Sequence, residues 1–101
     1  MKMNNMMKQA QKMQSQMMQI QEKLAEETVE GNAGGGMVKA IATGQGNLVE
    51  IKIDPEVIKP EDVEILEDLV LVAVNDSLEK SRDLANSRMG VFTNALSSLG
   101  L

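Results

Sequence analysis

Residues 3–24 read MNNMMKQAQKMQSQMMQIQEKL, and this stretch decides the fold. Its apolar side chains recur at alternating steps of three and four residues, which is the a/d spacing of a helix that packs against another helix. This seam consists of Met3, Met6, Ala10, Met13, Met17, Ile20 and Leu24. A single helix cannot bury such a stripe against itself. We therefore predict a coiled-coil helix over residues 1–26 in a homodimer, although the spacing leaves open whether the seam packs within one subunit or between two.

The composition of the 101 residues predicts one small domain, 1–101, without the usual catalytic side chains. Cysteine and histidine are absent, which removes thiolate nucleophiles, imidazole bases and the common zinc ligands. Phe92 is the only aromatic residue, so the core is small and a second subunit is expected to complete it. No apolar run approaches the ~20 residues of a membrane span, and no secretory signal follows Met1. We expect a cytoplasmic protein that is not an enzyme, with no catalytic residue, cofactor, metal site, membrane partner or small-molecule substrate.

Residues 27–54 predict a three-stranded antiparallel sheet. The first strand is expected to start at Thr28, and the others to cover 37–43 and 47–53, where apolar and polar residues alternate as in a sheet with one wet face. The segment GNAGGG at 31–36 is expected to form a flexible connection, and GQG at 44–46 a tight turn. Both glycine clusters lie between strands, whereas a phosphate loop joins a strand to a helix, so we predict no nucleotide site.

Residues 55–89 predict a helical segment. Asp54 and Pro55 form a start signal, a capping side chain followed by proline, and Pro60 restarts the helix about one turn later. Apolar residues then recur at helical steps on a face wide enough to be covered from two sides. The acidic residues near the start are interpreted as a solvated helix terminus rather than a metal or catalytic cluster. Gly90 is expected to end the helix and to leave 90–101 as a flexible tail. The predicted fold class is α+β, in the order helix, antiparallel sheet, long helix.

The net charge of −5 is unevenly distributed. Residues 1–23 carry four lysines and one glutamate, a balance of +3, while the remainder has a balance of −8. The acidic total argues against tight, charge-driven binding of nucleic acid, whereas the basic first helix favours a local contact. Because aromatic side chains for base stacking are lacking, single-strand binding is disfavoured.

Several segments in this order resemble the YbaB/EbfC family of bacterial nucleoid-associated proteins. They are MKQAQKM at 7–13, GGGMVKA at 34–40, GQG at 44–46, VEIKIDPE at 49–56, EDL at 67–69, AVNDSL at 73–78 and MGVFT at 89–93. The resemblance covers about residues 3–93. It departs from the family's pattern at 93–96, where TNAL replaces a tail that is commonly rich in glycine and contains proline.

The resemblance implies a homodimer shaped like tweezers that binds double-stranded DNA with low sequence specificity, organises the nucleoid, regulates genes and catalyses nothing. Family members are expected to contact DNA through the first and last helices. Carried onto this chain, the DNA-binding residues are Lys2, Lys8, Lys12, Lys80, Arg82 and Arg88. The alternative hypothesis is an adaptor that docks a partner protein on the methionines of the first helix, because thioether side chains form adaptable surfaces. DNA binding would then be incidental.

Overall fold

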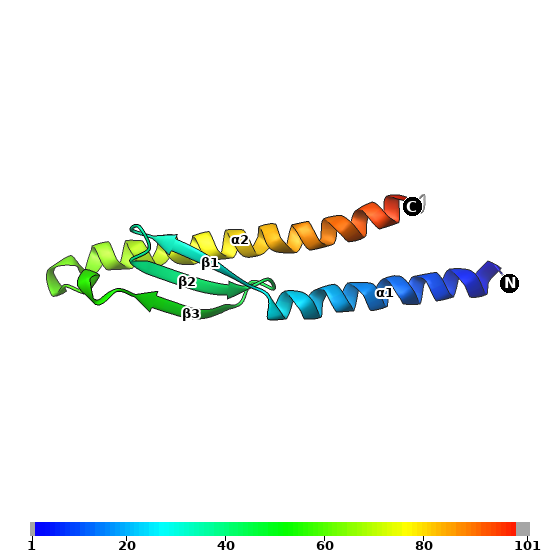
Figure 1. Cartoon of the computed structure of the whole chain (residues 1–101), viewed down its shortest axis with the longest axis horizontal. Coiled ribbons are helices and arrows are strands. Elements are labelled where there is room, and N and C mark those ends of the chain that lie inside the picture. Colours follow the sequence, from blue (N-terminus) through cyan, green and yellow to red (C-terminus); the bar gives the residue numbers. More distant parts are fainter. Residues whose placement is uncertain (1, 99–101) are drawn as a thin grey trace.

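The computed structural model describes residues 2–98 and shows two helices that extend from a small sheet. The element order is α1 (Lys2–Glu26), β1 (Thr28–Ala33), β2 (Val38–Thr43), β3 (Leu48–Ile53), two single 3-10 turns, η1 (Pro55–Val57) and η2 (Pro60–Asp62), and α2 (Val63–Ser98). This confirms the predicted α+β class. The molecule measures 72 × 19 × 15 Å, because α1 and the second half of α2 project from the same end of the sheet (Figure 1).

The sheet is antiparallel in the order β1-β2-β3. Gly31 pairs with Ala40 and Ala33 with Val38, while on the other side of β2 Ala40 pairs with Ile51. A bulge interrupts the β2–β3 register between Ile41 and Ala42, which increases the local twist. One face of β1 and β2 is covered by α2, so the residues in those rows are buried.

The core between α2 and the sheet is built from small side chains. Its buried members are Ala33, Val38, Ala40 and Ala73, flanked by half-buried residues such as Leu66 and Val70. On α2, Ser77 and Ser81 are also buried, and the Ser81 hydroxyl donates to the carbonyl of Thr43 at 2.7 Å. Small side chains bring the helix close to the strands, but they bury little apolar area.

The start signals before the long helix are confirmed with a refinement. The Asp54 carboxylate accepts a hydrogen bond from the amide of Glu56 at 2.9 Å and caps η1, which has Pro55 at its first position. Pro60 opens η2, and the regular helix begins only at Val63. The predicted single helical segment is therefore two short turns followed by α2.

Two predicted boundaries are wrong. Residues Gly31–Ala33 belong to β1 and not to a flexible loop, because the missing side chain of Gly31 is what allows β1 to approach α2. The long helix does not end at Gly90 but continues to Ser98. No proline follows Gly90, and one glycine inside a helix costs only about 1 kcal/mol relative to alanine. The predicted flexible tail is thus helical as far as Ser98, and residues 99–101 lie outside the described residues.

Candidate nucleic-acid interface

Two helical arms carry a net positive charge, six basic against three acidic residues, while the rest of the described chain carries a net negative charge. We define the α1 arm as Lys2–Glu26 and the α2 arm as residues 82–98, which follow the hydrogen bond of Ser81 to the end of β2. Residues 2–21 hold three lysines and no acidic residue. By contrast, the body, residues 27–81, holds four basic and twelve acidic residues, a balance of −8. A polyanion would therefore be attracted to the arms and repelled by the body.

The lysines of the α1 arm are available to a ligand. Lys8 and Lys12 are exposed, and neither forms an ion pair within the described part of the chain. They are four residues apart and thus share one face of the helix. The side chain of Lys2 lies outside the described residues. At about 100° per residue, this lysine face lies opposite the apolar seam.

Lys23 was missed by the sequence reasoning. It follows Lys12 by eleven residues, about three helical turns, and therefore lies on the same face of α1. Its side chain is exposed. Residues that are three, four, seven or eleven positions apart share one face of a helix. A search for basic residues at these steps from Lys8 and Lys12, and not only for clusters in the sequence, would have found Lys23.

Lys80 is part of the junction between α2 and β1. Its ammonium group lies 3.2 Å from Asp76 Oδ2 and donates to the carbonyl of Glu30 at 2.9 Å. Asp76 Oδ2 also accepts from the backbone amide of Asn32 at 3.0 Å. The hydrogen bond from Asn32, and then the one from Lys80, lower the pKa of Asp76 below its ordinary value of 3.8.

Arg88 is also engaged within the subunit. Its Nε donates to Glu27 Oε2 at 3.2 Å, and a second guanidinium nitrogen bonds to Glu27 Oε1, so the pair is bidentate. This hydrogen bond lowers the pKa of Glu27 below its ordinary value of 4.5 and raises that of Arg88. Of the predicted contacts on α2, only Arg82 is exposed without an ion pair among residues 2–98.

The apolar seam of α1 is mostly uncovered in the single chain. Leu24, at its end, is buried with 1% exposure, and Met13 and Ile20 are half-buried. The remaining members, Met3, Met6, Ala10 and Met17, are exposed. Packing within the single chain therefore leaves four of the seven seam residues exposed.

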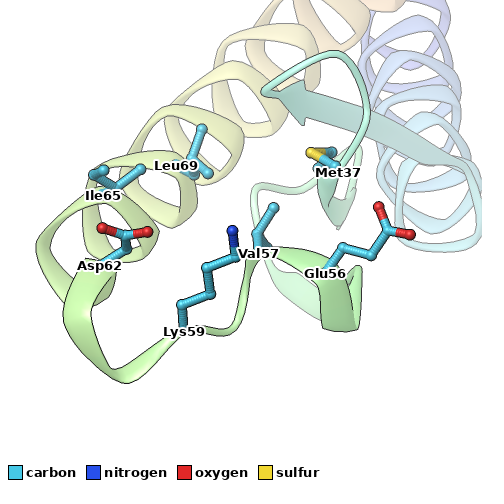
Figure 2. A pocket seen from close by; sticks show the side chains of 7 residues that line it. All are labelled: Met37, Glu56, Val57, Lys59, Asp62, Ile65 and Leu69. Atoms are coloured by element: carbon cyan, nitrogen blue, oxygen red, sulfur yellow. The ribbon is translucent and has the colours of Figure 1, made fainter.

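A groove of about 540 Å³ lies beside η1, η2 and the start of α2 (Figure 2), at the end of the body opposite the arms (Figure 1). Met37, Val57, Ile65 and Leu69 contribute apolar side chains to it, and the charged groups of Glu56, Lys59 and Asp62 line the rest. Within residues 2–98, no three acidic side chains are grouped to hold a metal ion. In the same range, neither helix is long and apolar enough to cross a membrane.

The chain is similar over nearly its whole length to known proteins. Residues 1–96 match the model of the YbaB/EbfC DNA-binding family. A nucleoid-associated protein of Pelotomaculum thermopropionicum is 50% identical over 99 residues, covering 98% of this chain and 94% of that protein. One of Bacillus thuringiensis is 56% identical over 98 residues, covering 97% and 90%.

A solved structure shows the same fold. The crystal structure of an uncharacterized protein from Helicobacter pylori aligns with a TM-score of 0.76 at 26% sequence identity, covering 95% of this chain and 98% of that one. The family match and the identity to nucleoid-associated proteins agree with the resemblance of the sequence segments. This chain belongs to the YbaB/EbfC DNA-binding family, which is defined by DNA binding and not by a reaction.

Proposed function

We propose that this protein is a homodimer that grips the backbone of double-stranded DNA with its arms and reads few base edges. The observation that carries the proposal is the separation of charge between the arms and the body. Lys8, Lys12 and Lys23 of the α1 arm face solvent along one side of the helix, while the body has a balance of −8. Phosphate contacts fix a protein on a duplex without reading its sequence, so low specificity follows from such a surface.

The α1 arm has the size and chemistry for this contact. Its 25 residues span about 37 Å at 1.5 Å per residue. One turn of B-DNA is roughly 34 Å long along its axis, so a single arm laid along the duplex can span a whole turn. Asparagine, glutamine and serine occupy much of its polar surface, and these side chains donate hydrogen bonds to phosphate oxygens.

The contact residues that we propose are the basic side chains of the arms that form no ion pair in the described part of the chain, together with Lys2, whose side chain lies outside it. They are Lys2, Lys8, Lys12, Lys23 and Arg82. Lys80 and Arg88 already bind carboxylates, and each would have to leave its partner before it could contact a phosphate. That exchange has a cost in electrostatic energy and leaves an unpaired carboxylate beside the DNA.

The surface of the single chain supports a second copy as partner. It exposes 7386 Å², whereas a compact monomer of 11.0 kDa exposes roughly 5,600 Å². The difference exceeds the roughly 800 Å² per partner that a stable interface buries. An incomplete core and two long arms account for the difference.

We infer that the second copy packs on an apolar groove beside β3. α2 covers β1 and β2 but not β3, so Ile51 is 40% exposed although it shares a row with the buried Ala40. Beside it, a groove of about 460 Å³ is lined by Ile53, Val63, Leu66, Glu67, Val70, Leu71 and Val74. In a twofold-related dimer the same apolar residues of both copies would lie at one shared interface, as in other closed dimers.

We infer a location in the nucleoid, and roles in its organisation and in gene regulation, from the names of the relatives, which are called nucleoid-associated proteins.

One observation favours the adaptor that docks a partner protein as a second candidate function. Met17 and Met18 are 42% and 59% exposed and line a shallow hollow of about 470 Å³ with Gln45. A methionine surface of this kind adapts to a partner protein.

The test is a titration of double-stranded DNA at several salt concentrations with the wild type, a Lys8→Glu/Lys12→Glu variant and a Lys52→Glu/Lys59→Glu control. The control changes the same charge on the body. We expect salt-dependent binding that the first variant loses and the control retains. Equal binding by all three proteins would contradict the site. Absence of binding even at low salt, together with a stoichiometric protein partner on the methionine face, would favour the adaptor.

A further inference from the structure

The α1 arm is attached to the body at its base. Leu24 packs on Gly44, where a β-carbon would lie 2.8 Å from Leu24 Cδ2. The Gly44 amide donates to the carbonyls of Leu24 and Glu27, both at 2.9 Å, and the Gln45 side chain donates to the Gln21 carbonyl at 2.8 Å. These contacts fix one end of a long helix whose other residues are mostly exposed.

The ion pair of Arg88 with Glu27 joins the base of the α1 arm to the α2 arm. Glu27 directly follows α1, and Arg88 lies two helical turns beyond Ser81, where α2 is bonded to the end of β2. The two side chains, with Ile20 and Lys23, line a hollow of about 380 Å³ between the arms. The guanidinium is planar and bidentate, so it fixes both the distance and the angle between the segments it joins.

A small change at this base is amplified at the tip. The arm extends about 35 Å from Glu27, so a tilt of about 10° moves its first turn by about 6 Å. Successive base pairs of DNA are about 3.4 Å apart along the axis. The tilt would therefore displace the tip of the arm by almost two base pairs relative to the other contacts of the protein, and Lys8 and Lys12 by about 5 and 4 Å.

We propose that Arg88 is a positioning residue, and that its ion pair with Glu27 is a brace that sets the spacing between the α1 and α2 arms. The competing role is direct contact with phosphate. The Arg88 guanidinium already forms two hydrogen bonds to Glu27, which it would have to give up or share before it could contact a phosphate. The claim that the brace affects DNA binding rests on the proposed function. The claim that it sets the spacing between the two arms does not.

The brace is tested first without DNA, by the distance between two spin labels on one subunit. The chain has no cysteine, so Gln11→Cys on the α1 arm and Asn86→Cys on the α2 arm provide unique attachment sites. Labelled subunits are diluted into unlabelled protein so that each measured distance lies within one chain. We compare the wild type, Arg88→Glu, Glu27→Arg, the charge-swapped double variant and Arg88→Lys, with Arg82→Glu as a control on the same helix.

We expect a narrow distance distribution in the wild type and in Arg82→Glu, and a broad one in Arg88→Glu and Glu27→Arg. The charge-swapped variant should restore most of the narrow distribution. Arg88→Lys should restore it only in part, because an ammonium group cannot form the bidentate pair. Circular dichroism checks that each variant keeps its helices. An unchanged distribution in Arg88→Glu would overturn the brace.

DNA affinity then separates positioning from contact. Arg88→Glu should weaken binding roughly tenfold under either role. The charge-swapped variant has the same net charge as the wild type. If Arg88 only positions the arms, the affinity of this variant should return to within about threefold of the wild-type affinity. Affinity that stays as weak as that of Arg88→Glu would show that Arg88 contacts phosphate. A wild type that binds no DNA would refute the proposed function alone, since the distances are measured without DNA.

Discussion

Gly31 of β1 lies directly against Ser77 of α2. A β-carbon on Gly31 would overlap the Ser77 amide nitrogen and the Ala73 carbonyl oxygen, and would lie 2.8 Å from Ser77 Cα. The Ser77 hydroxyl donates back to the carbonyl of Val74 at 2.7 Å, so this buried side chain is satisfied within its own helix. Strand and helix backbones are therefore in contact at this point, without a side chain between them.

Gly31→Ala should destabilise the protein by about 1–3 kcal/mol or more, because α2 must move away from β1 to make room for the methyl group. The atoms in the way belong to the backbone and cannot rotate aside. Urea unfolding of the variant measures the effect. A free energy of unfolding equal to that of the wild type would show that the helix and strand are not so close.

Gly90→Ala should have the opposite effect and serves as the matched control. Gly90 lies inside α2, and a β-carbon there would meet nothing within 4 Å. Alanine is favoured over glycine in a helix by about 0.5–1 kcal/mol, so the free energy of unfolding should rise by that amount. A decrease would mean that the end of α2 is not helical in solution.

The order of elements could be predicted from the sequence because each element carries a local signal. The seam of α1, the alternation in β3 and the Asp54-Pro55 cap are all patterns over a few residues. The strand assignment of Gly31 could not be predicted in this way, since it depends on the close approach of Ser77, which is distant in sequence. The stop predicted at Gly90 was wrong because glycine permits a helix end without requiring one.

The site was predicted only as far as charge patterns allow. Lys8 and Lys12 are exposed on one face, as a basic stretch of amphipathic helix indicates. The ion partner of Arg88 is 61 residues away, and the carbonyl that Lys80 binds is 50 residues away. Such pairings depend on the fold, so the sequence could not separate structural from available cations.

Leu71→Glu should convert the proposed dimer to a monomer. Leu71 is 60% exposed in the single chain and lines the groove in which a second copy would pack. Burying an unpaired carboxylate there would cost several kcal/mol. Ile65→Glu is the control, because Ile65 is 58% exposed but lines the other groove, near η2. Light scattering should give a monomer mass for the first variant only; equal masses would argue against this interface.

The stability of the protein should decrease as the solution becomes acidic, and Asp76 should contribute to that decrease. Its pKa is lower in the folded chain than its ordinary value of 3.8, so protons bind more readily to the unfolded chain. The stabilisation by the Asp76 carboxylate is therefore complete above pH 3.8, its ordinary pKa, and is lost as the pH falls through the lower pKa of the folded chain. Asp76→Asn still accepts from Asn32 but does not titrate. Melting temperatures measured between about pH 5 and pH 2 should fall less in the variant than in the wild type.

Lys23→Gln should weaken DNA binding and reduce its dependence on salt. Lys23 continues the exposed lysine face of α1 but belongs to no sequence cluster. Each phosphate contact contributes about 0.9 to the slope of log K against log salt concentration, so a dimer that loses two contacts should have a slope shallower by up to about 1.8. Lys59→Gln, an equal change of charge on the body, should leave the slope unchanged. If both variants reduce the slope equally, overall charge rather than the arm face determines binding.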